Sequence, residues 1–262
     1  MNLSLKDKHA IVCGSTQGIG KAIAVELALL GASVTLIARN EEKLQSVVKE
    51  LSTSEGQQHD FLVADFSKPE ELQQKIGSFL AAKSAVHILV NNTGGPAGGP
   101  IIDASLDQFT QTFSNHLLCN HILAQATVPF MKQAGYGRII NIISTSVKQP
   151  IKGLGVSNTI RGAVGNWAKT LSLELAQFGI TVNNVLPGAT LTGRLESIIE
   201  TKAGKTGHSS EEISGEMMAE IPAGRFGAPE EIAAAAAFLA TPAAAYINGI
   251  NVPVDGGRTG NL

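Results

Sequence analysis

Short apolar runs alternate with helical patterns along the first 190 residues of the chain. Continuous apolar runs predict buried strands, whereas apolar residues spaced three and four apart predict helices that pack on a core. The expected strands span residues 9–14, 32–38, 61–64, 87–91, 138–143, 180–186 and 250–254. The expected helices span residues 19–30, 41–51, 70–82, 106–131, 156–178 and 229–240.

Strands that are apolar on both faces and separated by helices are typical of a parallel sheet covered on two sides. With right-handed crossovers, this order predicts the α/β class and a doubly wound, Rossmann-like sheet of about seven strands with helices on both faces. We expect residues 1–262 to form a single domain, because segments from both ends of the chain complete one sheet.

The segment 190–224 interrupts this alternation, since it is polar, rich in Gly, Ser and Glu, and holds no strand candidate. Long insertions late in an α/β chain are often functional, and we predict a mobile lid over a ligand. The alternative is a partly disordered segment on the surface. Its cationic residues hint at an anionic or polar substrate, although such residues are usually only solvated: Arg194, Lys202, Lys205 and His208.

Composition narrows the classes of function. Of 262 residues, 44% are hydrophobic and 16% charged, which predicts one large core and excludes a disordered chain. The net charge is −2 and no basic run is present, so we expect no nucleic-acid partner. Two cysteines and six scattered histidines predict no metal site. Without a leader pattern or a spanning apolar stretch, we expect a cytoplasmic protein and no membrane partner.

A glycine-rich turn follows the first predicted strand. It reads Gly14-Ser15-Thr16-Gln17-Gly18-Ile19-Gly20 and leads into a predicted helix. Gly14 permits the turn, Gly18 lets the backbone approach a pyrophosphate, and Gly20 lets the helix pack on the strand. The N-terminus of the helix offers free N–H groups to phosphate. We therefore predict a dinucleotide site, with a tight turn that binds nothing as the alternative.

The residue after the second predicted strand indicates which dinucleotide the site binds. An acidic residue there would bind the ribose 2′-hydroxyl of NAD, but this chain has Arg39. A guanidinium can hold a 2′-phosphate, so the sequence favours NADP(H) over NAD(H). A solvated arginine in a turn is the alternative.

These motifs resemble the short-chain dehydrogenase/reductase family over nearly the whole chain, and the 3-oxoacyl-[acyl-carrier-protein] reductases in particular. Asn91-Asn92-Thr93-Gly94 is similar to the family's Asn-Asn-Ala-Gly turn, and Val254-Asp255-Gly256-Gly257 to its terminal segment. The resemblance implies that Asn115 supports a proton-relay water and that Ser144 holds the substrate carbonyl. It also implies a homotetramer or dimer that associates through the helices 106–131 and 156–178.

The resemblance implies further cofactor contacts, with Asp65 at the adenine ring and the segment from Pro187 to Thr192 at the nicotinamide. Together with the residues above, the predicted cofactor site comprises Gly14, Ser15, Thr16, Gln17, Gly18, Ile19, Gly20, Arg39, Asp65, Asn91, Gly94, Arg161, Pro187, Gly188 and Thr192.

The chain departs from the family at its Tyr-x-x-x-Lys pair. The tyrosine position, thirteen residues after Ser144, holds Ser157, and the lysine position holds Arg161. The i, i+4 spacing still puts both side chains on one helix face. A serine hydroxyl is a much weaker acid than a phenol, and an arginine does not release its proton. The family's usual mechanism therefore cannot run on these residues.

Neither tyrosine of the chain replaces this acid. Tyr136 precedes the fifth predicted strand, at the end of the sheet opposite the site, and Tyr246 is expected to be structural. Lys148 and His116 are other candidate donors, although each is more simply explained as a solvated loop residue or a helix-packing residue.

Two hypotheses about function remain. In the first, the chain is an NADP(H)-dependent oxidoreductase acting on a small ketone or 3-oxoacyl thioester. Its predicted catalytic residues are Ser144, Asn115, Ser157 and Arg161, the last three ordering a water that supplies the proton. In the second, it is a catalytically silent NADP-binding subunit, a sensor or a scaffold. We favour the first; a lyase or isomerase has no specific support.

Overall fold

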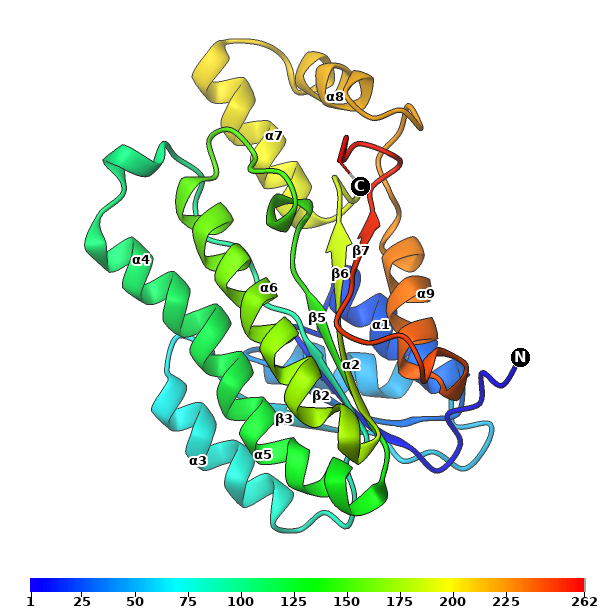
Figure 1. Ribbon diagram of the computed structural model, residues 1–262. Coiled ribbons are helices and arrows are strands. Elements are labelled where there is room, and N and C mark those ends of the chain that lie inside the picture. Colours follow the sequence, from blue (N-terminus) through cyan, green and yellow to red (C-terminus); the bar gives the residue numbers. More distant parts are fainter. Residues whose placement is uncertain (262) are drawn as a thin grey trace.

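Seven parallel strands form one sheet in the order β3-β2-β1-β4-β5-β6-β7 in the computed structural model, which describes residues 1–261 (Figure 1). The strands are β1 (His9–Cys13), β2 (Ser33–Ala38), β3 (Asp60–Val63), β4 (Ile88–Asn91), β5 (Gly137–Ile142), β6 (Ile180–Pro187) and β7 (Asn251–Val254). The strand order reverses between β1 and β4, and ligands of such sheets bind outside the carboxyl ends of the strands at that point. The predicted doubly wound sheet is confirmed.

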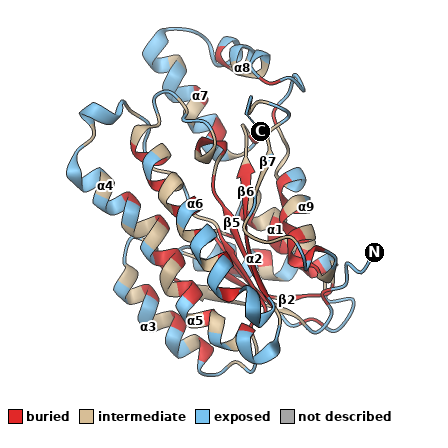
Figure 2. Cartoon of the chain, viewed as in Figure 1, coloured by how far each residue is buried: buried red, intermediate tan, exposed pale blue. Residues whose placement is uncertain are grey.

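Helices cover both faces of the sheet (Figure 1). On one face, α1 (Gly18–Leu29), α2 (Glu41–Glu50) and α9 (Pro229–Ala240) share one buried apolar cluster with the strands. On the other face, α3 (Pro69–Leu80), α5 (Cys119–Ala134) and α6 (Gly155–Leu175) share a second. Figure 2 shows the central strands largely buried between these layers, whereas the edge strands β3 and β7 are only partly covered. Their continuous apolar runs are therefore explained by burial on both faces.

The expected helix over 106–131 is wrong in its middle. The chain forms α4 (Leu106–Phe113), a π-helical turn over Ser114–Leu118, and then α5. A π turn adds one residue to the helix and so changes which side chains face inward. His116 is consequently buried, whereas Asn115 is only partly covered.

Two helices occupy the segment 190–224, in which the sequence holds no strand candidate. They are α7 (Gly193–Thr206) and α8 (Ser210–Ala219), which lie beyond the carboxyl ends of β6 and β7 (Figure 1). A small apolar cluster holds them together: Leu195, Ile199, Ile213, Ile221 and Phe226. Few apolar side chains suffice for this packing, which explains why the polar composition did not reveal the helices. Their role as a lid stays a prediction.

A ladder of asparagine side chains crosses four neighbouring strands, from the last residue of β4 to the first residue of β7. Asn91 donates a hydrogen bond to Asn141 (2.8 Å), Asn141 to Asn184 (2.9 Å), and Asn184 to Asn251 (2.8 Å). The four residues stand directly opposite one another in the strand register. Since each amide both donates and accepts, the ladder specifies how β4, β5, β6 and β7 align below the site.

No helix within the described residues is long and apolar enough to cross a membrane. Residues 1–261 also hold no group of three or more His, Cys, Asp or Glu side chains that could bind a metal ion.

Candidate active site

The glycine-rich turn between β1 and α1 is locked to the turn after β4 by Asn92. The Asn92 side-chain amide donates to the carbonyls of Cys13 and Gly14, each at 3.2 Å. A Cβ on Gly20 would lie 2.2 Å from the Gly14 carbonyl oxygen, so no other residue fits between helix and strand here. Close packing therefore accounts for Gly20, as the sequence predicted, whereas Asn92 was not singled out as a site residue.

The N-terminus of α1 has unpaired backbone donors. Gln17 occupies the cap position without a side-chain hydrogen bond, and the first turn contains no acidic residue. By contrast, Asn40 caps α2 by accepting a hydrogen bond from the Lys43 backbone at 2.8 Å. The Oγ of Ser15, next to this terminus, is buried and has no hydrogen-bond partner among the described residues. A phosphate group would satisfy free N–H groups at this terminus, so the residues fit a dinucleotide.

Two charged side chains stand at the carboxyl ends of β2 and β3. Arg39 directly follows β2 and is exposed, and Asp65 lies two residues beyond β3. The pKa of Asp65 is lowered, chiefly because its carboxylate accepts a backbone hydrogen bond from Ser67 at 2.9 Å, and further by the charge of Arg39. The structure thus brings the two residues predicted to hold the adenosine end of a cofactor to one edge of the sheet.

Arg161 reaches the turn that holds Ser144, beyond the carboxyl end of β5, and Ser157 precedes Arg161 by one turn of α6. Ser144 follows the strand in extended conformation, and its Oγ accepts a hydrogen bond from the Ser146 backbone at 3.1 Å. Ser157 and Arg161 lie one turn apart on α6, and Ser157 is buried. Arg161 donates through Nη1 to the carbonyl of Ile143, the residue before Ser144. The guanidinium therefore lies beside the serine that the sequence singled out.

Arg161 carries an uncompensated charge. No carboxylate within residues 1–261 forms an ion pair with it. Burial, and secondarily the charge of Arg194, lower the pKa of Arg161 to about 10. The guanidinium is thus cationic at neutral pH, and it adds a positive charge to a partly covered site where such charges act strongly.

His116 contacts the turn after β4, and the role of Asn115 in the relay stays a prediction. His116 Nδ1 is 2.6 Å from Thr93 Oγ1, in the turn after β4. Burial, and then the charge of Arg161, lower the pKa of His116 to about 3, so its imidazole is neutral at neutral pH. The Asn115 side chain contacts Gln111, whose Nε2 donates to Asn115 Oδ1 at 2.7 Å. The π turn is the signal that separates these two neighbours, and residue periodicity does not reveal it.

The remaining predicted residues surround the same crevice. The Asn91 side chain is committed to the asparagine ladder, while Gly94 is exposed in the following loop. Pro187 ends β6, and the Gly188 N–H donates to the Val254 carbonyl at 3.0 Å. A Cβ on Gly18 would lie 3.1 Å from Cγ2 of Thr192, so Thr192 covers the glycine-rich turn. In that turn Gln17 is exposed, whereas Thr16 and Ile19 are half-buried.

The two tyrosines lie away from Ser144, and Lys148 follows it in the same loop. The Tyr136 hydroxyl donates to the Ala240 carbonyl at 2.6 Å, at the amino end of β5, as expected. The Tyr246 side chain is fully exposed. Lys148 is held through its backbone, since its carbonyl accepts a hydrogen bond from Asn261 at 2.9 Å. Neither tyrosine can take the place of Ser157.

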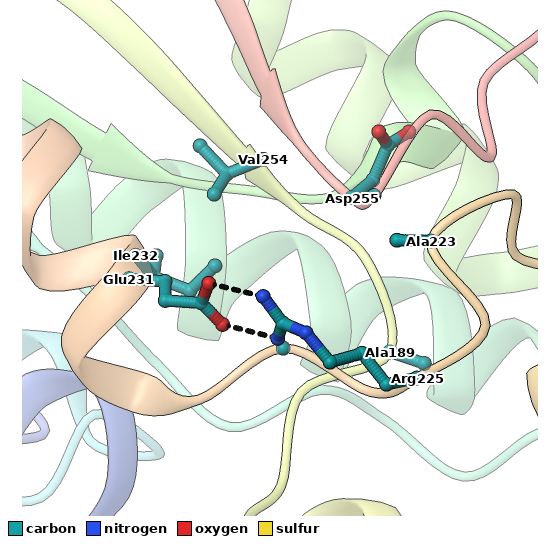
Figure 3. A pocket seen from close by; sticks show the side chains of 9 residues that line it. Ala189, Ala223, Arg225, Glu231, Ile232, Val254 and Asp255 are labelled. Carbon is teal, nitrogen blue, oxygen red and sulfur yellow. Dashed lines mark hydrogen bonds and ion pairs between the residues drawn. The ribbon is translucent and has the colours of Figure 1, made fainter.

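A separate small cavity lies where the chain enters α9 (Figure 3). Arg225 and Glu231 form a two-point ion pair across it, with both N–O distances 2.7 Å. Glu231 also accepts from the Ala228 backbone at 2.8 Å. None of the residues that line this cavity belongs to the group around Ser144. The ion pair between Arg225 and Glu231 attaches the start of α9 to the preceding loop.

Glu231→Gln is expected to reduce stability at neutral pH but not in acid. The hydrogen bond from Arg225 lowers the pKa of Glu231 to about 2, below its unfolded value. Its contribution is therefore present above about pH 4.3 and is lost as the pH falls toward 2. Urea unfolding midpoints of Glu231→Gln and wild type should differ near pH 7 and converge toward pH 3. Glu230→Gln, on the same turn of α9, is the control, and an equal loss in both variants would refute this assignment.

Known proteins show the same fold. A family model described as enoyl-(acyl carrier protein) reductase matches residues 14–259. The NADPH-dependent reductase BacG of Bacillus subtilis is 30% identical over 254 residues, 97% of this chain and 98% of that protein. D-beta-hydroxybutyrate dehydrogenase of Rhizobium meliloti is 34% identical over 259 residues, covering 96% and 98%.

Among solved structures, L-sorbose reductase from Gluconobacter frateurii, complexed with NADPH and L-sorbose, superimposes with a TM-score of 0.93. The two chains are 29% identical and each is covered completely. Fold and site together define an oxidoreductase of the dinucleotide-binding α/β class. Within that class, the chain belongs to the short-chain dehydrogenase/reductase family.

Proposed function

We propose that this chain is an NADP(H)-dependent oxidoreductase that interconverts a small carbonyl compound, such as a ketone or a 3-oxoacyl thioester, and its alcohol. The observation that carries the proposal is the cationic guanidinium of Arg161, held on the Ile143 carbonyl beside Ser144. Arg161 retains the positive charge that the family's lysine supplies, although Ser157 replaces the family's tyrosine. The NADPH-dependent relatives support the choice of cofactor.

The residues fit a dinucleotide as follows. The free N–H groups at the start of α1 would hold the pyrophosphate, with Thr192 across the turn. Arg39 would bind the 2′-phosphate and Asp65 would lie at the adenine. NADP(H), when bound, supplies or accepts the hydride.

The chain's own groups stabilise the oxygen of the substrate. Ser144 and Ser157 can donate hydrogen bonds to it, and Arg161 stabilises the negative charge that develops there when the carbon gains a hydride. The oxygen then takes a proton from water, because neither hydroxyl is a strong acid. His116 is neutral at neutral pH. Its imidazole forms a hydrogen bond with this water and does not supply the proton. We propose His116 as a further member of the relay, and Asn115 stays a predicted member.

Exposed apolar side chains support association of like subunits. Leu106 and Phe113 on α4 and Leu173 on α6 are exposed. We propose a homotetramer or dimer through these helices, since apolar patches of this kind mark interfaces. Cys13 and Cys119 are buried and unpaired. We keep the cytoplasm as the proposed compartment, because unpaired thiols are typical of reducing compartments.

Arg39→Asp is expected to weaken NADPH binding roughly 10- to 100-fold, since it removes a charge-assisted contact and adds a repulsive carboxylate. NADH, which has no 2′-phosphate, should lose little affinity. Fluorescence titration of both cofactors measures this, with Lys49→Gln at the far end of α2 as the control. Equal losses for NADPH and NADH would contradict the assigned contact.

NADPH oxidation over a panel of ketones, oxo acids and 3-oxoacyl thioesters tests the function itself. The proposal expects turnover by the wild type. Absence of turnover with NADPH bound, together with activity gained in Ser157→Tyr/Arg161→Lys, would instead support the silent subunit. An active parent that loses turnover in the double variant would exclude it.

A further inference from the structure

Two guanidinium groups converge on the loop after β4. A Cβ on Gly95 would lie 3.4 Å from Nη2 of Arg161 and 3.7 Å from Nη2 of Arg194. Arg194, in the first turn of α7, donates through the same Nη2 to the carbonyl of Pro96 at 2.6 Å. Arg161 reaches the loop from α6. The two cations thus approach one glycine from separate elements.

This pair has no neutralising partner. Neither arginine forms an ion pair with a carboxylate in residues 1–261. Two like charges at short range repel each other, and the repulsion is stronger where the surroundings exclude water. Two of the other four arginines form ion pairs, Arg225 with Glu231 at 2.7 Å and Arg258 with Glu220, whereas Arg39 and Arg138 form none within the described residues. An anion that binds between Arg161 and Arg194 would relieve the repulsion.

We propose that Arg161 and Arg194 form the subsite for a carboxylate of the substrate, so that the substrate class is a small oxo acid. This rests on the proposed function. Because Arg161 also holds the carbonyl of Ile143, next to Ser144, the carboxylate lies within a few carbons of the reacting carbonyl. Glycine at 95 leaves the approach to both guanidinium groups open.

The position of the pair favours the substrate over the phosphates of the cofactor. The pyrophosphate site is at the start of α1, where Asn92 and Thr192 contact the glycine-rich turn. Arg39 serves the 2′-phosphate at the end of β2, on the other side of β1. The arginine pair lies instead on the side of β5 and α6. Arg194 is the cation of segment 190–224 that contacts this loop. His208 instead faces its own helix, with Nδ1 3.6 Å from Oε2 of Glu212.

Binding of inert ligands tests the subsite without turnover. Butanoate and butanamide differ only in charge, and each is titrated into the protein loaded with NADP⁺, with ligand-observed NMR as the readout. We expect butanoate to bind more tightly than butanamide to the wild type. Arg194→Gln should weaken butanoate binding roughly 10- to 100-fold, because a hydrogen bond to a charged group is lost. NADPH affinity should change less than about twofold.

Activity gives a second readout. The probes are 2-oxobutanoate, 3-oxobutanoate and 4-oxopentanoate, each compared with its methyl ester. For the reactive acid, Arg194→Gln should raise KM roughly 10- to 100-fold with little change in kcat, since Arg194 binds the substrate away from the reacting carbon. The KM of the matching ester should not change. Lys202→Gln, which removes a charge from the same helix, is the control and should behave as the wild type.

Three results would overturn the subsite: equal binding of butanoate and butanamide, equal butanoate binding by wild type and Arg194→Gln, or a loss of NADPH affinity in Arg194→Gln while butanoate binding stays. The last would assign the pair to the cofactor. These outcomes differ from failure of the proposed function, in which butanoate binds selectively but no probe is reduced.

Discussion

Arg161→Gln is expected to lower kcat/KM for NADPH oxidation roughly 10²- to 10³-fold, the usual loss when one donor to a developing oxyanion is removed. Glutamine keeps a hydrogen-bonding group but has no charge. Arg194, the neighbouring cation, contacts Pro96 and not Ile143, so it is not positioned to take over this contact. The loss should therefore appear in the chemical step, as a decrease in kcat.

The Arg161→Lys variant tests whether the site requires the positive charge alone or the planar guanidinium group. It restores the family's cation at the same position, and we expect it to retain activity within about tenfold of the wild type. Unfolding midpoints and NADPH titration of both variants show whether the fold and the cofactor site survive. If Arg161→Gln is as active as Arg161→Lys, the guanidinium is not the group that stabilises the oxyanion.

The second large effect concerns stability. Asn141→Leu should reduce the free energy of unfolding by about 3 kcal/mol or more, because it removes two buried hydrogen bonds and leaves partners without them. The two atoms that lose their hydrogen-bond partner are Asn91 Nδ2 and Asn184 Oδ1. Asn91 Oδ1 already has no partner among the described residues. Urea denaturation at neutral pH measures the loss.

Asn251→Leu is the matched control at the open end of the ladder. Asn251 accepts one ladder hydrogen bond and is only partly buried, so about 1 kcal/mol is expected. Comparable losses in the two variants would mean that the asparagines act independently, and that the ladder does not align β4 through β7.

The fold could be predicted because its signals are local. Each strand is a continuous apolar run, and burial on both faces of a parallel sheet requires such runs. The helix at 106–131 was predicted wrongly at Ser114–Leu118, since one inserted residue leaves the apolar spacing almost unchanged. The same insertion buries His116 against the turn after β4, a contact that helical periodicity does not reveal.

The site could be predicted only in part. The glycine-rich turn is contiguous, and the step from Ser157 to Arg161 is one helical turn, so sequence spacing was enough to find both. The contacts of Arg161 with Ile143 and of Arg194 with Pro96 join segments far apart in the chain. Such contacts depend on tertiary packing, and the charge of Arg194 gave only a weak hint of them.

The pH dependence of kcat/KM for NADPH oxidation tests most directly the claim that a cation, and not a titrating acid, supports the chemistry. The pKa of His116 is about 3 and that of Arg161 about 10, so neither group changes charge near neutral pH. We predict measurable turnover that is independent of pH from about pH 6 to about pH 9. An ionisation within that range, or no turnover with NADPH bound, would contradict the account.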